Sequence, residues 1–456
     1  MRRVRDRSGD LVPLRVAVGA WWRVSLQTFG GPAGQISVMH RELVEQRRWI
    51  GEGRFLHALS FCTLLPGPEA QQLAIYLGWL LNGTLGGLVA GVLFVLPGFV
   101  AIMGLSVLYA GWGSSLAVTA LFAGIAPAVL AIVVHAVVRL GRRALRSPGL
   151  VGLSVAAFLA LALFAVPFPI VVLAAGGVGF LIGRSNPDLF ASTGSDAGAA
   201  AGVAPPLIPD DALHGATPSW PRALRLLAVG VGLWGAPVLA AVVLAGADSI
   251  FVVQARFFGG AALVTFGGAY SVLVYVAQQA VEVYGWLAPG EMITGLAMAE
   301  TTPGPLIQVV QFVGFMGAHG APGGIDPWLA GVLAATLVTW VTYVPCFLFI
   351  FLGAPHVEAL RHDRRLTSAL AGITAAVVGV IANLALYLAL HTLFDEVRSE
   401  RIGPLALQVP DVSTSQPVAA VVAALASVLL FTYRWSVLRT LIPCAALGAA
   451  LHVATA

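Results

Sequence analysis

The sequence contains no lysine, and all 25 of its basic residues are arginine. The phosphate loop of nucleotide-driven pumps needs a lysine, so this chain is not itself an ATP-driven pump of that type. Charged residues make up only 10%, whereas a soluble domain has about 25%. Hydrophobic residues make up 58%, and the mean hydropathy is +0.89. So few polar groups cannot cover a surface that faces water, and the composition predicts a membrane protein.

Cysteine is also scarce. The three residues are far apart, with no zinc-type spacing and no disulfide framework, so they are expected to be small buried residues. We expect no metal site and no cofactor. The sequence pI is about 9.2, but the arginines form short clusters between apolar runs. That pattern is typical of cytoplasmic loops of membrane proteins, and it argues against nucleic-acid binding.

Apolar runs of the length of a membrane helix recur along the chain. The predicted segments are 13–38, 55–81, 85–109, 114–138, 150–165, 168–184, 224–246, 251–278, 292–316, 329–352, 367–393, 413–432 and 436–454. Two of them, 55–81 and 292–316, are interrupted by Pro-Gly-Pro. The fold class is therefore all-α, with about 13 segments.

The second part of the chain repeats the first. Matches at an offset of 237 residues fall in five separate clusters, and their single common register makes chance an implausible explanation. Further matches follow at an offset of 248. The pairs at 237 are 28–31 with 265–268, Val44 with Val281, Trp49 with Trp286, Gly53 with Gly290, 66–68 with 303–305 and Gln71 with Gln308. The pairs at 248 are Pro97 with Pro345 and 124–125 with 372–373.

Six segments fall in each half, and one unmatched segment lies between the halves. We divide the chain into a first repeat (1–184), a flexible linker (185–223), a linking helix (224–250) and a second repeat (251–456). The extra crossing inverts the second repeat. Arginine-rich loops follow the fourth segment of the first half and the third segment of the second, as inverted repeats and the positive-inside rule require.

The arginines of the first loop do not fit a topology in which every segment crosses the membrane once. Arg41, Arg47, Arg48 and Arg54 follow the first segment, which would place them outside if the basic N-terminus is inside. The conflict disappears if segments 13–38 and 55–81 are re-entrant hairpins, because zero and two crossings leave the later topology unchanged. Both alternatives stay open.

Pro-Gly-Pro should break a membrane helix, because proline removes a backbone donor and glycine permits unusual dihedral angles. Broken backbone is tolerated at membrane depth only beside protein or a wet cavity. The half-helices that begin after Pro68 and Pro305 would offer free N–H groups and a positive dipole end to an anion. A simple proline kink packed by glycine is the alternative.

The shared pattern Gly-Gly-x12-Val-x4-Trp-x16-Pro-Gly-Pro resembles a known family. FGGPAGQISVMHRELVEQRRWI with FCTLLPGPEAQQLAIYLGW, and TFGGAY with AETTPGPLIQ, are similar to the two halves of long-chain chromate ion transporters. The resemblance implies export of chromate across the inner (plasma) membrane, without enzymatic activity. The alternatives are a sulfate or other oxyanion carrier, an anion channel, and, as the least favoured, a membrane-embedded enzyme.

Candidate site residues lie around the two breaks. The candidate substrate-binding residues are Gly30, Gly31, Pro66, Gly67, Pro68, Gln71, Gln72, Gly267, Gly268, Pro303, Gly304, Pro305 and Gln308. Glu69 and Glu300 are candidates for proton coupling, because burial favours the neutral form of a carboxyl group. Each could instead cap a half-helix. The expected partners are chromate or a sulfate-like oxyanion, protons and the lipid bilayer, with no nucleic acid and with a homodimer left open.

Overall fold

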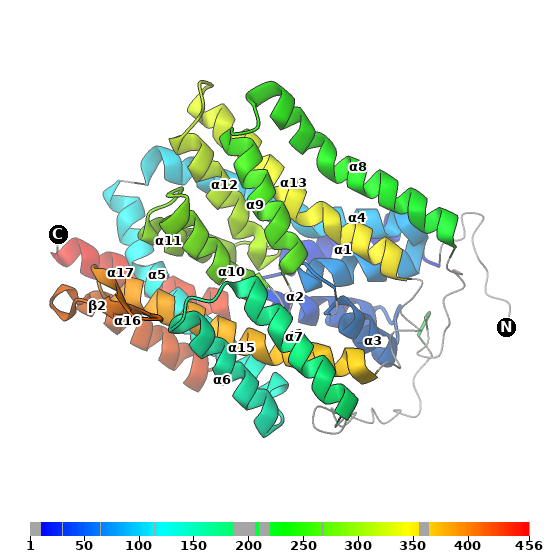
Figure 1. Ribbon diagram of the computed structural model, residues 1–456. Coiled ribbons are helices and arrows are strands. Elements are labelled where there is room, and N and C mark those ends of the chain that lie inside the picture. Colours follow the sequence, from blue (N-terminus) through cyan, green and yellow to red (C-terminus); the bar gives the residue numbers. More distant parts are fainter. Residues whose placement is uncertain are drawn as a thin grey trace.

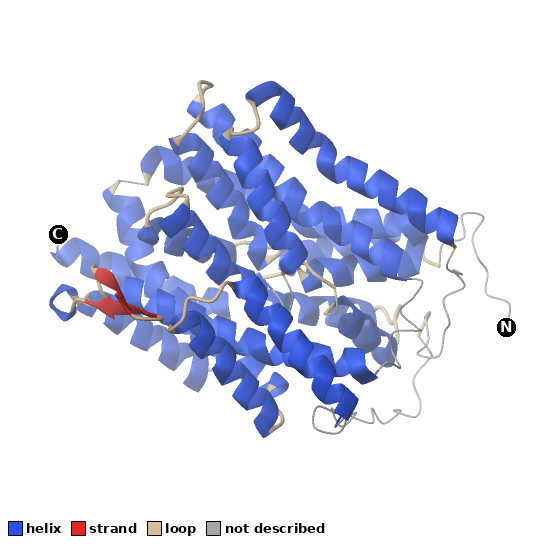
Figure 2. Ribbon diagram, viewed as in Figure 1, coloured by secondary structure: helices blue, strands red, loops and turns tan. Residues whose placement is uncertain are grey.

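The computed structural model describes residues 11–29, 31–63, 65–113, 115–185, 206–208, 219–265, 269–354 and 364–455. It is almost entirely helical, as predicted (Figures 1 and 2). The helices of the first half are α1 (Leu14–Gln27), α2 (Gly31–His40), η1 (Arg41–Gln46), α3 (Glu52–Cys62), α4 (Glu69–Trp112), α5 (Leu116–Ala144), α6 (Pro148–Ala162) and α7 (Phe168–Ser185).

The linking helix α8 (Trp220–Ala245) starts four residues earlier than predicted. The second half contains α9 (Ile250–Val264), α10 (Ala269–Gln278), η3 (Gln279–Val283), α11 (Pro289–Thr301), η4 (Leu306–Gln308), α12 (Val309–Gly320), α13 (Pro327–Gly353), α15 (Arg364–Leu393), α16 (Pro417–Ser427), η7 (Val428–Thr432) and α17 (Val437–Thr455).

Within the described ranges, five helices are long and apolar enough to cross a membrane on their own: α4, α5, α8, α13 and α15. The chain is therefore a multi-pass membrane protein. The predicted single segments 13–38 and 251–278 are wrong in one respect, because each is divided into two shorter helices around its Thr-Phe-Gly-Gly motif.

Helix α4 also consists of two parts, because the chain turns back at Asn82 and Gly83. Gly83 has a φ of 62°, which glycine adopts without strain. A Cβ atom built on Gly78 would lie 2.6 Å from the Cβ of Ala90, although a continuous helix would separate these residues by about 18 Å. The two parts therefore pack against each other, as the separate helices α12 and α13 do in the second half.

Two helical hairpins open the first half. Nη2 of Arg41, just after α2, donates to Oε1 of Gln27 on α1 at 2.8 Å, although a continuous helix would separate their Cα atoms by about 21 Å. Nη2 of Arg54 on α3 likewise donates to the hydroxyl of Tyr76 on α4 at 3.4 Å. The chain therefore folds back at both 28–31 and 66–68.

Two corresponding hairpins open the second half. The rings of Phe257 on α9 and Tyr284, just after η3, are 5.5 Å apart. A Cβ built on Gly295 of α11 would lie 2.5 Å from the ring of Phe312 on α12. The predicted segments 55–81 and 292–316 are thus hairpins broken at Pro-Gly-Pro, rather than kinked helices.

The two halves interlock through their remaining helices. Helix α5 of the first half packs against α16 and α17 of the second, and α15 of the second packs against α6 and α7 of the first (Figure 1). Helices α4 and α13 also pack together, as do α5 and α15. The largest apolar core accordingly contains residues from both halves, such as Val129 and Ile381.

Helix α8 is the outermost helix at the upper edge of Figure 1, and none of its residues is buried. It is held to α13 by two reciprocal hydrogen bonds. Nε1 of Trp234 donates to the carbonyl of Val341 at 3.0 Å, and Nε1 of Trp340 donates to the carbonyl of Leu233 at 2.9 Å. The other face of α8 is apolar and exposed, as expected of a helix in contact with lipid.

Two features were not predicted. An antiparallel hairpin, β1 (Val397–Ile402) and β2 (Leu405–Pro410), follows α15 and appears at the left of Figure 2. Within the linker, Ile208 is buried, and its backbone pairs with Trp49 and Gly51. This part of the linker is therefore bound to the first half.

Candidate functional site

Both Pro-Gly-Pro motifs are non-helical, as the sequence predicts. Helix α3 ends at Cys62 and α4 begins at Glu69, whereas α11 ends at Thr301 and η4 begins at Leu306. The central glycines have nearly the same conformation, with a φ of 115° at Gly67 and 111° at Gly304. Other residues adopt that region only under strain, so glycine is required at both breaks.

Each break is hydrogen-bonded to the opposite half. The N–H of Gly67 donates to the carbonyl of Thr265 at 2.7 Å. The N–H of Gly304 donates to the carbonyl of Thr28 at 3.0 Å and lies 3.2 Å from its hydroxyl. Both glycines and both threonines are repeat partners at an offset of 237 residues, so the two contacts are equivalent.

Each break also packs against a helix of the opposite half. A Cβ on Gly67 would lie 2.8 Å from the sulfur of Cys346 on α13, and a Cβ on Gly98 of α4 would lie 2.5 Å from the carbonyl oxygen of Pro303. Gly98 and Cys346 directly follow Pro97 and Pro345, which are repeat partners. There is no room for a larger side chain at either contact.

Glutamine side chains surround the breaks. Gln71, Gln72, Gln308 and Gln311 are buried to 1% exposure or less. Nε2 of Gln72 donates to the carbonyl of Pro66 at 2.6 Å, Gln308 donates to Gln311, and Nε2 of Gln311 donates to the carbonyl of Phe99 at 2.9 Å. These bonds position three of the four amides.

The amide of Gln71 is different. Neither its nitrogen nor its oxygen has a hydrogen-bond partner among the described residues, and the oxygens of Gln72 and Gln308 also lack one. A buried polar group without a partner costs about 1–3 kcal/mol, so such groups need an explanation. Here they lie beside two helix breaks, where a polar ligand or water would satisfy them.

The two carboxyl groups occupy opposite helix ends. Glu69 is the first residue of α4 and is half-buried. Glu300 is the second-last residue of α11 and is 1% exposed. A helix N-terminus stabilises negative charge and a C-terminus opposes it, so the two side chains have different electrostatic surroundings.

Of the remaining predicted residues, Pro66, Pro68 and Pro305 lie in the breaks. Gly31 begins α2 with a φ of 70°. Gly30, Gly267 and Gly268 lie outside the described residues.

Several residues at the breaks were not predicted from the sequence. Nε2 of Gln35 donates to the carbonyl of Gly304 at 2.5 Å, and Thr28 and Thr265 accept the cross-half bonds. The threonines were detectable as members of the repeated motif. Arg54, counted only as a loop charge, is 4% exposed on α3. The burial of this cation at the start of α3 could not be predicted from its position in the sequence.

These features define a helical membrane protein with two helix breaks that are hydrogen-bonded to the opposite half and lie beside buried amides. Broken helices of this kind occur in membrane transporters. The chain belongs to the chromate transporter family, whose family model matches residues 17–180 and 253–450. Members of this family are transporters rather than enzymes.

Named relatives match most of the chain. A chromate transport protein of Pseudomonas aeruginosa is 33% identical over 388 residues, which cover 84% of this chain and 81% of that protein. A chromate transport protein of Cupriavidus metallidurans is 27% identical, covering 84% of each. A probable chromate transport protein of Synechococcus elongatus is 26% identical, covering 89% of this chain and 92% of that protein. No solved structure matches this chain.

Proposed function

We propose that this chain is a proton-coupled secondary transporter that exports chromate across the inner membrane, a role in chromate resistance. The observation that carries the proposal is the pair of helix breaks, each hydrogen-bonded to the opposite half, together with the amide of Gln71, which has no partner among the described residues. The similarity to named chromate transport proteins supports chromate as the substrate.

The chemistry of the breaks suits a tetrahedral dianion. The helices that follow Pro68 and Pro305 begin there with free N–H groups, and amide nitrogens add neutral donors. Neutral donors can bind an oxyanion without the strong ion pair that would slow its release. The buried Arg54 lies on α3, where its charge favours the approach of an anion.

We further propose that the halves form an inverted repeat with the domain limits 1–184, 185–223, 224–250 and 251–456. The equivalent cross-half bonds of Gly67 and Gly304, and the two separate stretches that match the family model, support this arrangement. A structure whose halves superpose about an axis along the membrane normal would contradict it.

The hairpins before the long helices would then be re-entrant. In the first half, the ends of the two hairpins that are remote from the breaks lie together. The N–H of Leu11 donates to the carbonyl of Leu81 at 3.0 Å, and His40 lies 2.7 Å from Glu52. This end is arginine-rich, which favours the cytoplasmic side. The equivalent outer ends of the second half, around Gln254 and Gly314, would face outward.

Proton coupling would use Glu69 and Glu300. A dianion near a buried carboxyl group favours its protonated form, so substrate binding and proton uptake would support each other. The negative end of α11 adds to this effect at Glu300, whereas the positive end of α4 opposes it at Glu69. Glu300 is therefore the stronger candidate.

The test is flux through the purified chain in liposomes. Proton-dependent movement of chromate against its gradient is expected of a carrier. Flux that only dissipates a gradient would indicate an anion channel instead. Parallel assays with sulfate in everted vesicles decide between chromate and another oxyanion, because preferred sulfate transport would refute the assignment of substrate.

A further inference from the structure

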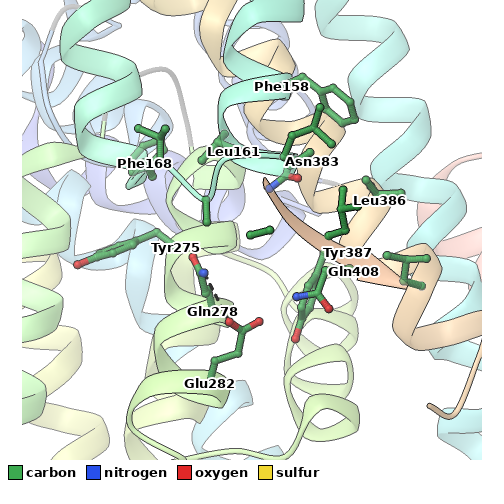
Figure 3. Close-up of a pocket in the computed structure, with 17 residues that line it drawn as sticks. Phe158, Leu161, Phe168, Tyr275, Gln278, Glu282, Asn383, Leu386, Tyr387 and Gln408 are labelled. Carbon is green, nitrogen blue, oxygen red and sulfur yellow. Dashed lines mark hydrogen bonds between the residues drawn. The ribbon is translucent and has the colours of Figure 1, made fainter. Parts of the chain in front are cut away.

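A pocket with several polar side chains on a mostly apolar lining lies outside the helix breaks, with a cavity volume of about 260 Å³ (Figure 3). It is bounded by the turn between α6 and α7, by α10 with η3, by α15 and by β2. The N–H of Ala406 on β2 donates to the carbonyl of Leu163 at 2.7 Å, which holds the hairpin against that turn. The pocket is thus closed on one side by the unpredicted hairpin.

The polar side chains of the pocket face one another across it. Gln278 and Glu282 come from one wall, and Tyr387 and Gln408 from the other (Figure 3). Nε2 of Gln278 lies 3.5 Å from Oε2 of Glu282. Among the seventeen lining residues, Glu282 is the single charged side chain, and no arginine is present.

The repeat partners of the pocket residues differ from them in charge. At offsets of 237 and 248, Gln278 corresponds to Arg41, Asn383 to His135, Tyr387 to Arg139 and Leu390 to Arg142, whereas Glu282 corresponds to Glu45. The counterpart positions are therefore strongly basic, and those of the pocket are neutral apart from one carboxylate. This difference in charge changes how strongly an anion is attracted to the pocket and to the equivalent region of the first half.

We propose that this pocket is the outer vestibule of the transport path, a low-affinity site through which a tetrahedral oxyanion leaves the protein. The proposal rests on the proposed function. Amide and hydroxyl groups of Gln278, Asn383 and Tyr387 give the departing dianion neutral hydrogen-bond donors. The carboxylate of Glu282 repels it and keeps its residence short.

The size of this repulsion follows from Coulomb's law. For a dianion about 7 Å from one carboxylate in a water-filled mouth, removing the charge changes affinity by about fivefold to tenfold. Salt reduces the effect, so the measurement belongs at low ionic strength.

The experiment compares the two faces of the full-length protein. Everted membrane vesicles expose the cytoplasmic face, so uptake of radiolabelled chromate from the medium measures affinity at the inner mouth. Graded chromate inside the vesicles measures inhibition from the outer mouth. The variants are Glu282→Gln and Gln278→Arg, the second of which installs the residue type of Arg41. Glu400→Gln on β1 is the matched control, an exposed carboxylate outside the pocket.

We expect both pocket variants to lower the inhibitory internal chromate concentration about fivefold to tenfold, with the KM for uptake unchanged. Glu400→Gln should behave as the wild type. The proposal is overturned if the pocket variants match this control. It is also overturned if the KM for uptake and the inhibitory internal concentration change by the same factor. Absence of chromate uptake by the wild type would instead refute the proposed function, and the vestibule with it.

Discussion

Replacing Gln71 by leucine should make the protein more stable and less active. Leucine has nearly the volume of glutamine and removes a buried amide whose nitrogen and oxygen both lack partners among the described residues. Relief of that cost should stabilise the empty protein by about 1–3 kcal/mol. For a chain of this size, the melting temperature should rise by about 1–3 °C.

Transport should change in the opposite direction. If the Gln71 amide binds the oxyanion, its loss removes a buried hydrogen bond to a charged group, which is worth about 1.5–3 kcal/mol. Chromate flux at low substrate concentration should then fall by about tenfold or more. Opposite signs in stability and flux distinguish a ligand-binding amide from a structural one.

Two assays and one control test this prediction. Thermal unfolding in detergent can be followed through the intrinsic fluorescence of the 11 tryptophans, and flux through radiolabelled chromate in proteoliposomes. The control is Gln72→Leu, which removes the bond to the Pro66 carbonyl and should lower the melting temperature. The reasoning is refuted if Gln71→Leu is destabilised like the control, or if it transports at the wild-type rate.

Three further predictions concern the breaks and α8. Gly304→Ala forces a side chain onto a φ of 111° and should cost about 1–3 kcal/mol of stability, with a loss of flux. Gly104→Ala is the control, which has open space around it and should be neutral or stabilising. Equal melting curves of the two variants would contradict this. Glu300→Gln or Glu69→Gln should retain chromate binding but lose the dependence of net flux on the pH gradient, and unchanged pH dependence in both would make the carboxylates structural. Trp340→Phe should weaken the attachment of α8 by about 0.5–1.5 kcal/mol, seen as faster proteolysis between α7 and α8; an unchanged rate would argue against the role of this hydrogen bond.

Much of the fold could be predicted from the sequence because the relevant forces are local. Apolar runs must form helices in lipid to satisfy their backbone groups, so the limits of α7, α13 and α17 follow from hydropathy within a few residues. Pro-Gly-Pro breaks a helix wherever it occurs, and both predicted breaks were confirmed. The repeat register also paired residues that prove equivalent, such as Gly67 and Gly304.

Only the tertiary structure decided where these local elements turn and what they contact. The fold-back at Asn82 and Gly83 depends on packing between Gly78 and Ala90, and hydropathy does not distinguish a hairpin from a continuous span. The bonds from Gly67 to Thr265 and from Gly304 to Thr28 join residues about 200 or more positions apart, which no local pattern encodes. Likewise, the sequence does not distinguish a glutamine whose amide is hydrogen-bonded, such as Gln72, from one whose amide has no partner among the described residues, such as Gln71. Hydrogen-bond satisfaction depends on the neighbours in space, and that is what turns a repeated motif into a candidate site.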